Sequence, residues 1–170
     1  SFICKKNKNS KLDFNAVAQG YSVDLVSEFL INRGIKNYLV EIGGELSSKG
    51  VNNNGDYWKI GIEKPVDSSL IGQFGFQRIV ELKNNSLATS GNYRKFKIIN
   101  GKKVSHSINP STGFPVNNSL LSVTVICKMA ANADALATSF MVMGKERSIE
   151  YINKFKSDSI LCYMIYDSLN

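Results

Sequence analysis

The chain has 170 residues, of which 43% are hydrophobic and 21% are charged, and its formal net charge is +7. This length suits one ordinary domain with its own core, and no apolar run approaches the roughly 18 to 20 residues of a membrane-spanning helix. The lysines are scattered in small groups without interleaved aromatic residues, so we expect no nucleic-acid partner.

The first third of the chain predicts a helix followed by strands. Apolar residues recur at helical spacing over residues 17–32, and Gly34 follows as a helix-ending residue. Residues 38–42 are typical of a buried strand that ends at a glycine pair. Alternating apolar residues predict another strand over 57–63, and Pro65 ends it because proline cannot donate a ladder hydrogen bond.

The rest of the chain predicts strands with two further helices. Asn100 and Gly101 stand between strand-like residues 95–99 and 102–108, which is the strongest short signal for a hairpin. The other expected elements are strands over 74–82, 120–127 and 159–166 and helices over 130–143 and 145–156, the first of them ended by Gly144. This order predicts one α+β domain over residues 1–170, a mostly antiparallel sheet with helices packed on one side.

Three cysteines stand far apart in the chain, at Cys4, Cys127 and Cys162. They lack the C-x-x-C spacing of zinc ribbons and thioredoxin-type sites, so we expect neither. Cys127 and Cys162 lie in apolar strand-like runs, and we expect both side chains to be buried.

Asp134 and Thr138 stand four residues apart in the first of the two late helices. This spacing places a carboxylate and a hydroxyl on one helical face, one turn apart. Two hard oxygen donors side by side suit Mg²⁺ or a phosphate with its Mg²⁺. The structural alternative is an Asp in a first helical turn that meets the helix dipole, with a Thr bonded back to its own helix.

Three loop segments are richer in small residues than connectors need to be. Residues 13–24 join a strand end to a helix start, where free amides attract anions. The glycine pair within residues 41–45 permits positive φ and close ligand approach. Residues 87–93 combine hydroxyls with a glycine. The structural alternatives are a helix cap, a tight turn and a hydroxyl-stabilised turn, respectively.

A fourth loop, residues 105–116, holds the only histidine of the chain, His106. Histidine titrates near neutral pH, so His106 suits proton transfer or phosphate contact. A purely structural role is the alternative for a lone histidine.

Five segments in this order resemble the ApbE family, the bacterial FAD:protein FMN transferases. The matching segments are residues 13–24, 41–45, 88–91, 105–115 and 133–138. The resemblance covers the C-terminal half to two-thirds of the family's domain, and the family's N-terminal region has no counterpart in this chain.

The resemblance implies a T-fold-related α+β domain that binds FAD and uses Mg²⁺ to split its pyrophosphate. Members of the family pass FMN to a threonine hydroxyl of a client protein and release AMP. The clients are subunits of membrane redox complexes on the outer side of the inner membrane. We therefore expect a location in the bacterial cell envelope, on its periplasmic side, with a possible lipid anchor upstream of this chain.

The resemblance also implies roles for individual residues. Asp134, Thr138 and the backbone carbonyl of Ala16 match the family's metal ligands, and His106 matches its proposed catalytic residue. The segments that match the family's flavin nucleotide site contain Ala18, Gln19, Gly20, Asp24, Glu41, Gly43, Gly44, Thr89, Ser90, Gly91 and His106.

Three residues depart from the family's common pattern. Gln19 replaces a lysine, Asn109 replaces an aspartate, and Glu45 replaces an aspartate. The first two changes keep open an alternative function, a flavin-binding protein or FAD pyrophosphatase that does not transfer FMN to a client. A non-enzymatic basic surface module is a third hypothesis, which the scattered lysines disfavour.

Overall fold

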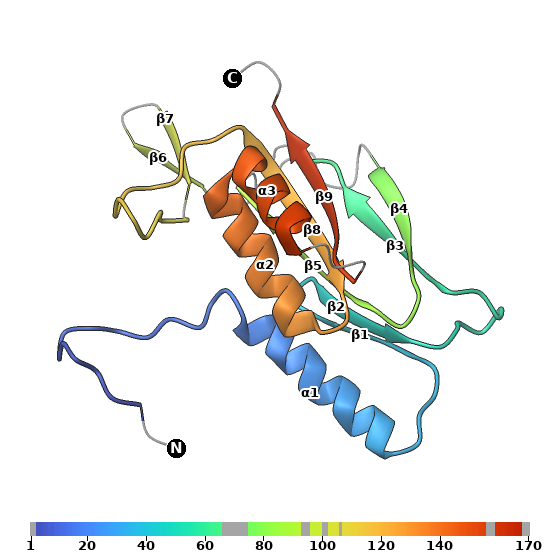
Figure 1. Cartoon of the computed structure of the whole chain (residues 1–170). Helices are drawn as coiled ribbons and strands as arrows, with labels where there is room; N and C mark the ends of the chain where they lie inside the picture. The colour runs from blue at the N-terminus through green and yellow to red at the C-terminus, as the bar shows by residue number, and fades with distance from the viewer. Residues whose placement is uncertain are drawn as a thin grey trace.

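Helices and strands form separate layers in the computed structural model, which describes residues 3–65, 75–92, 96–99, 102–105, 107–155 and 159–167. Within these residues the helices are α1 (Ala18–Asn32), α2 (Ala130–Met143) and α3 (Lys145–Phe155). The strands are β1 (Tyr38–Ile42), β2 (Glu45–Lys49), β3 (Trp58–Glu63), β4 (Phe76–Leu82), β5 (Ser86–Gly91), β6 (Phe96–Ile99), β7 (Lys102–Ser105), β8 (Leu120–Cys127) and β9 (Leu161–Tyr166) (Figure 1).

The main sheet has the strand order β1-β2-β5-β8-β9, and every neighbouring pair is antiparallel. A two-residue turn, Gly43 and Gly44, joins β1 to β2, since Ile42 stands opposite Glu45. Both glycines have positive φ, 68° and 107°. A tight hairpin turn with positive φ at both central residues strongly favours glycine. The conformation of the turn therefore explains why two glycines stand there.

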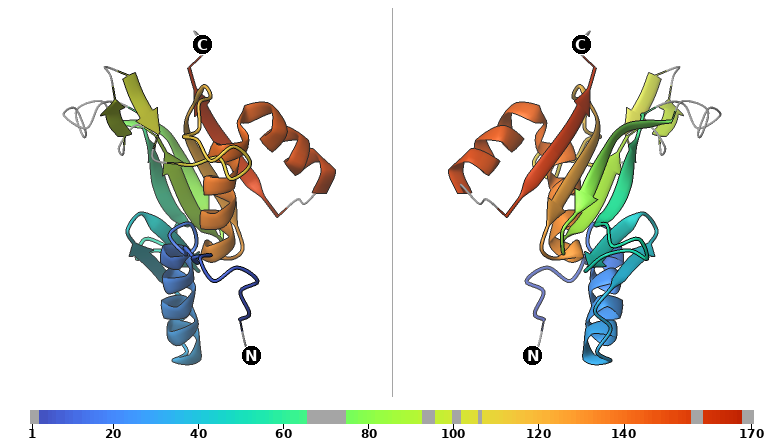
Figure 2. Two further views of the ribbon diagram at one scale, coloured as in Figure 1. Left: turned by 90° about the vertical axis from the view of Figure 1, so that its left-hand side faces the viewer. Right: turned by 90° about the vertical axis from the view of Figure 1, so that its right-hand side faces the viewer.

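The helices pack on one face of this sheet, as the sequence predicts (Figures 1 and 2). Helix α2 lies against β5 and β8, and its fully buried Phe140 belongs to a core with Ala88, Val123 and Val125. Burying a side chain of this size stabilises the fold by about 1.5–3 kcal/mol. Helix α1 packs on β1, β2 and α2 through the buried Val23.

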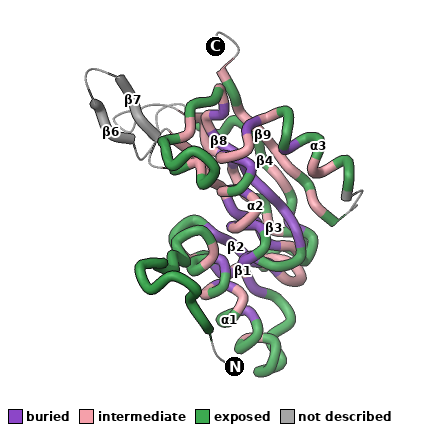
Figure 3. The backbone as a smooth tube through the Cα atoms, turned by 60° about the vertical axis from the view of Figure 1, so that its left-hand side comes forward, coloured by how far each residue is buried: buried purple, intermediate pink, exposed green. Residues whose placement is uncertain are grey.

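The hairpin of β3 and β4 covers the opposite face of the main sheet (Figure 2). Leu87 of β5 and Leu82 of β4 meet there in a second core, whereas Ala88 faces α2. Successive side chains of a strand point to opposite faces, so β5 contributes to both cores. Figure 3 shows the buried residues concentrated along the central strands.

Residues 87–93 were expected to form a loop, and this expectation was wrong for 87–91, which belong to the central strand β5. The hydroxyls that indicated a turn are bonded within the fold instead. Thr89 bonds Thr124 across the β5–β8 pair at 2.8 Å, and Ser90 bonds Thr138 of α2 at 2.8 Å. Strand β2 was also not expected, because the strand predicted over 38–42 ended at the glycine pair and no strand was predicted directly after it.

The other expected elements agree with the structure to within two residues at most ends. The hairpin predicted around Asn100 and Gly101 is present as β6 paired with β7, with Ile99 opposite Lys102. Gly34 and Gly144 follow α1 and α2 with φ of 78° and 81°. No helix among the described residues has the length and apolar character needed to cross a membrane.

Candidate functional site

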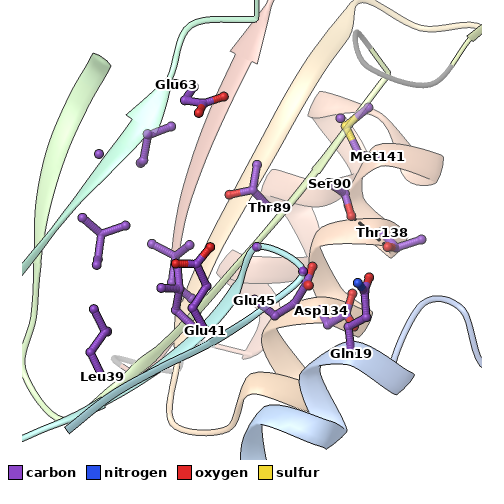
Figure 4. A pocket seen from close by; sticks show the side chains of 18 of the residues that line it. Gln19, Leu39, Glu41, Glu45, Glu63, Thr89, Ser90, Asp134, Thr138 and Met141 are labelled. Atoms are coloured by element: carbon purple, nitrogen blue, oxygen red, sulfur yellow. Dashed lines mark hydrogen bonds between the residues drawn. The ribbon is translucent and has the colours of Figure 1, made fainter. Parts of the chain in front are cut away.

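A cavity of about 490 Å³ lies between the β1–β2 hairpin, β3, the end of β5 and the first three turns of α2 (Figure 4). Many of the site residues predicted from the sequence line it. They are Gln19, Glu41, Gly43, Gly44, Thr89, Ser90, Gly91, Asp134 and Thr138. Ser107 also lines the cavity, so all five of the matched segments, far apart in the chain, meet at one site.

The cavity exists because β2 and β5 separate. These strands are paired only at Leu46–Leu87 and Ser47–Ser86. Beyond that point β5 continues alongside β8 as far as Gly91, which stands opposite Ser122. Among the described residues, no strand pairs there with the edge of β5 that faces β2, and the tip of the β1–β2 hairpin forms the other wall.

Asp134 is the most buried carboxylate of the cavity wall, with 5% of its surface exposed. Its Oδ2 accepts a hydrogen bond of 3.1 Å from the backbone N–H of Gly20 in α1. Burial raises the pKa of this carboxyl group above its ordinary value, and the Gly20 bond offsets part of that shift. The ionised form is therefore destabilised, and a cation beside it would stabilise it.

Thr138 lies one helical turn after Asp134, and its Oγ1 is 2.8 Å from Oγ of Ser90 on β5 (Figure 4). The two oxygens thus share the face of α2 that borders the cavity. The structural alternative, an Asp in the first helical turn with a Thr bonded to its own helix, does not describe this pair. Asp134 is the fifth residue of α2 and not in its first turn, and the Thr138 hydroxyl is bonded to another element.

The ionisable residues that line the cavity in the described chain are mostly acidic. They are Glu41, Glu45, Glu63 and Asp134 against one base, Lys59. This balance attracts cations and repels a bare phosphate. The carboxylate of Asp134 and the hydroxyl of Thr138 are oxygen donors of the kind that Mg²⁺ takes, so the donor set fits the ion that the sequence predicted. Among the described residues no cluster of three His, Cys, Asp or Glu side chains stands ready to hold a metal.

Three predicted binding residues lie beside the cavity without lining it. Gly20 is buried under α2, where a Cβ atom would collide with the carbonyl oxygen of Ala130. Asp24 accepts hydrogen bonds from the backbone N–H groups at the start of α2. Ala18 is exposed in the first turn of α1.

Two further predictions concern the proposed metal and catalytic groups. Ala16, whose carbonyl was expected to bind metal, is an exposed residue in the turn that leads into α1. His106 lies outside the residues that the structure describes, and its neighbour Ser107 lines the cavity.

Asn109, which departs from the family's pattern, organises the loop that follows. Its Oδ1 accepts a hydrogen bond of 2.9 Å from the N–H of Ser111, and its carbonyl accepts one of 2.8 Å from Gly113. An asparagine oxygen serves this turn as an aspartate oxygen would. The substitution therefore retains the turn.

Sequence reasoning missed several residues of the cavity wall, among them Leu39, Lys59, Glu63 and Met141. Lys59 and Glu63 belong to β3, which faces the site only because its hairpin folds over the main sheet. The alternation of β3 predicted a strand, and no local signal indicated which other segment it would meet.

The chain is similar to known proteins of the family whose sequence segments meet at this cavity. A family model described as the ApbE family matches residues 1–164. The FAD:protein FMN transferase of Vibrio cholerae serotype O1 is 46% identical over 138 residues, 81% of this chain and 40% of that protein.

Two solved structures are similar over nearly the whole chain. The flavin transferase ApbE from Vibrio cholerae has a TM-score of 0.77 at 41% identity, covering 92% of this chain and 47% of that one. The apo form of the Pseudomonas stutzeri flavinyl transferase ApbE has a TM-score of 0.78 at 37% identity, covering 93% and 46%. The chain spans less than half the length of each of these relatives, and it belongs to the ApbE family.

Proposed function

We propose that the protein is an Mg²⁺-dependent FAD:protein FMN transferase. The observation that carries the proposal is the convergence of Asp134 and Thr138 with the glycine hairpin and the end of β5 on one cavity. Relatives with 46% and 37% identity are named FAD:protein FMN transferase, which supports the same activity here. The activity is that of the whole natural protein, since this chain spans only part of its relatives' length.

In the proposed reaction, the acceptor hydroxyl oxygen attacks the phosphorus of the FMN half of FAD. The bond from that phosphorus to the bridging oxygen breaks, AMP leaves with this oxygen, and the hydroxyl proton passes to a base. Asp134 and Thr138 would hold the Mg²⁺, which when bound would neutralise pyrophosphate charge and stabilise the transition state. His106 is the proposed base or, as the alternative role, a hydrogen-bond donor to a phosphate oxygen.

Asp134 and Thr138 are the proposed side-chain ligands of the metal, together with the carbonyl of Ala16. Burial raises the pKa of Asp134, so this carboxylate gains more from a cation than an exposed one does. The hydroxyl of Ser90, 2.8 Å from that of Thr138, orients the threonine oxygen. This arrangement holds both donors in place before the metal binds.

The acidic cavity supports a metal-dependent reaction. A pyrophosphate entering beside four carboxylates is repelled unless a divalent cation enters with it. At Gly44, in the turn between β1 and β2, nothing lies within 4 Å of where a Cβ atom would stand, which leaves room for a ligand to approach the backbone.

A second function, hydrolysis of FAD to FMN and AMP without client transfer, is favoured by one observation. Gln19 lines the cavity and packs against Gly43. At the position of Gln19 the family commonly has a lysine. A neutral amide supplies no positive charge for the transferred phosphoryl group. Water would then replace the protein hydroxyl as the acceptor.

The acceptor and the location are further parts of the proposal. We propose a threonine hydroxyl on a subunit of a membrane redox complex as the acceptor, on the periplasmic side of the bacterial cell envelope. A lipid anchor in the natural protein would hold the enzyme there. The five sequence segments that resemble the family support these assignments.

The test incubates the natural protein with FAD, Mg²⁺ and a client that bears the acceptor threonine. A fluorescent flavin band that survives denaturing electrophoresis is expected, with AMP released in equal amount. Mass spectrometry of the nucleotides separates the two functions, because AMP with free FMN and an unlabelled client indicates hydrolysis. If neither labelled client nor free FMN with AMP is formed, both proposed functions are refuted.

A further inference from the structure

The start of α2 is capped by a carboxylate from another helix. Met129, the N-cap residue of α2, makes no side-chain capping bond. Instead, Oδ1 of Asp24 in α1 accepts a hydrogen bond of 2.8 Å from the N–H of Ala130. Its Oδ2 accepts one of 2.9 Å from the N–H of Ala131. Both oxygens of one carboxylate thus bind consecutive amides that have no partner within their own helix.

The start of α1 is capped in the same manner by α2. Val17, the N-cap residue of α1, makes no side-chain capping bond. The N–H of Gly20, in the first turn of α1, donates to Oδ2 of Asp134 at 3.1 Å. Each helix therefore receives at its first turn a carboxylate that the other helix supplies.

The contact between the two helices is made by the backbone as well as by these carboxylates. A Cβ atom at Gly20 would collide with the carbonyl oxygen of Ala130 and would lie 2.8 Å from Cα of Ala131. Ala130 is fully buried at this contact. The close packing and the three hydrogen bonds fix how far α2 slides along α1 and how it rotates about its own axis.

Asp134 follows Ala130 by one helical turn, so the position of the first turn of α2 determines where its carboxylate lies. Asp24 does not line the cavity, and both its oxygens are used by amides. It is therefore poorly placed to bind a nucleotide directly, which was its predicted role.

We infer that Asp24 is a positioning residue for the metal site: it holds the start of α2 so that Asp134 and Thr138 present their oxygens to the cavity. The inference rests on the proposed metal-binding role of these two residues. Loss of Asp24 frees two amides and lets the first turn of α2 shift or fray, which moves Asp134 first.

The test measures Mn²⁺ binding by electron paramagnetic resonance of the free ion, with FAD present and without turnover. Outer partners that orient metal ligands typically contribute about 10- to 100-fold in affinity. We expect Asp24→Ala to raise the Mn²⁺ Kd by about that factor. Asp24→Asn keeps one acceptor oxygen and is expected to fall between Asp24→Ala and the wild type.

Two control variants separate positioning from loss of charge and from general destabilisation. Glu28→Gln removes a negative charge from an exposed residue one turn further along α1, and its Mn²⁺ Kd is expected to equal that of the wild type. Leu82→Ala truncates a fully buried side chain of β4, on the face of the main sheet opposite to α1 and α2, so its melting temperature falls while its Mn²⁺ Kd stays within about twofold.

The inference is overturned if Asp24→Ala binds Mn²⁺ like the wild type, or if Leu82→Ala weakens binding as much as Asp24→Ala does. Wild-type protein that binds Mn²⁺ but does not transfer FMN would refute the proposed function and leave the positioning role standing. Wild-type protein that binds no Mn²⁺ in the presence of FAD would overturn both.

Discussion

The backbone N–H of Gly20 donates to the carboxylate of Asp134 across 114 positions of sequence, with a donor–acceptor distance of 3.1 Å. This single bond joins the first turn of α1 to the wall of the cavity. It offsets only part of the penalty of burying Asp134, so the pKa of that carboxyl group remains raised. A bound cation would reduce this penalty, because it would stabilise the ionised carboxylate.

Replacing Asp134 with asparagine is expected to stabilise the metal-free protein at neutral pH. The folded-state pKa of Asp134 lies above its ordinary value of 3.8, so the folded state holds this proton more tightly than the unfolded state. Asp134 therefore lowers the free energy of unfolding as pH rises from the unfolded pKa through the folded pKa, and the penalty is complete above both. Asparagine removes the charge and can still accept the Gly20 bond.

Thermal melts in EDTA at pH 7 and at about pH 4 check this prediction, because the variant's gain in melting temperature should shrink at the acidic pH. In the same variant, Mg²⁺-dependent turnover should fall by at least about 100-fold. A variant that is less stable than the wild type at pH 7 without metal would contradict the account of Asp134.

Thr138 is expected to act through its hydroxyl and not through its shape. Thr138→Val keeps the volume, removes the Oγ1 that lies 2.8 Å from Ser90, and should weaken Mn²⁺ binding by about 10-fold or more. Thr138→Ser keeps the hydroxyl and is the matched control, with binding close to that of the wild type. Equal Mn²⁺ affinity in the two variants, measured by titration, would exclude the hydroxyl as a ligand.

Gly20 is expected to tolerate no side chain. In Gly20→Ala the new methyl group meets the backbone of Ala130, which cannot move aside, so α1 and α2 must separate. Overpacking of this kind typically destabilises a protein by about 1–3 kcal/mol. Separation also breaks the bond to Asp134, so metal affinity should fall with stability.

Denaturant unfolding and Mn²⁺ titration measure the two effects of Gly20→Ala. Ser22→Ala is the control on the same helix, because Ser22 donates only to the carbonyl of Ala18 in its own turn. That variant should remain within about 0.5 kcal/mol of the wild type. A Gly20→Ala protein of wild-type stability would mean that the helices do not meet as closely as described.

The three cysteines are expected to differ in reactivity. Burial raises the pKa of Cys127 and raises that of Cys162 to about 12, whereas Cys4 is exposed. Only thiolates react quickly with iodoacetamide, so one fast-labelling thiol is expected in the native chain at pH 8. Peptide mass spectrometry should locate it at Cys4, and fast labelling of Cys162 would contradict the packing of β9 on β8.

The sequence predicted the elements well where one physical signal dominated. The apolar periodicity of α1, the alternation in β3 and the Asn100–Gly101 turn between β6 and β7 each depend on local geometry alone. The structure agrees with the first two to within one residue at each end, and it pairs β6 with β7, although β7 ends at Ser105 and the predicted strand continued to residue 108. Cys127 is buried as expected, whereas Cys162 is only half-buried in β9 at the sheet's edge.

Strand β5 was missed for a physical reason. Its serine and threonine hydroxyls also stabilise turns, and only the partners across the sheet show that they are bonded inside it. The contact of Asp24 with α2 was not predicted for a related reason. Its partners in α2 are more than 100 residues away in the sequence, so a carboxylate that caps a distant helix looks like one that binds a ligand.

The most direct test of the central claim is the mass of a client protein after incubation with FAD and the natural protein. It is measured with Mg²⁺ or EDTA, and with the wild type or Asp134→Asn. We expect a mass gain of one FMN moiety on a client threonine only for the wild type with Mg²⁺. A client labelled equally by Asp134→Asn, or labelled in EDTA, would contradict the metal-binding role assigned to this cavity.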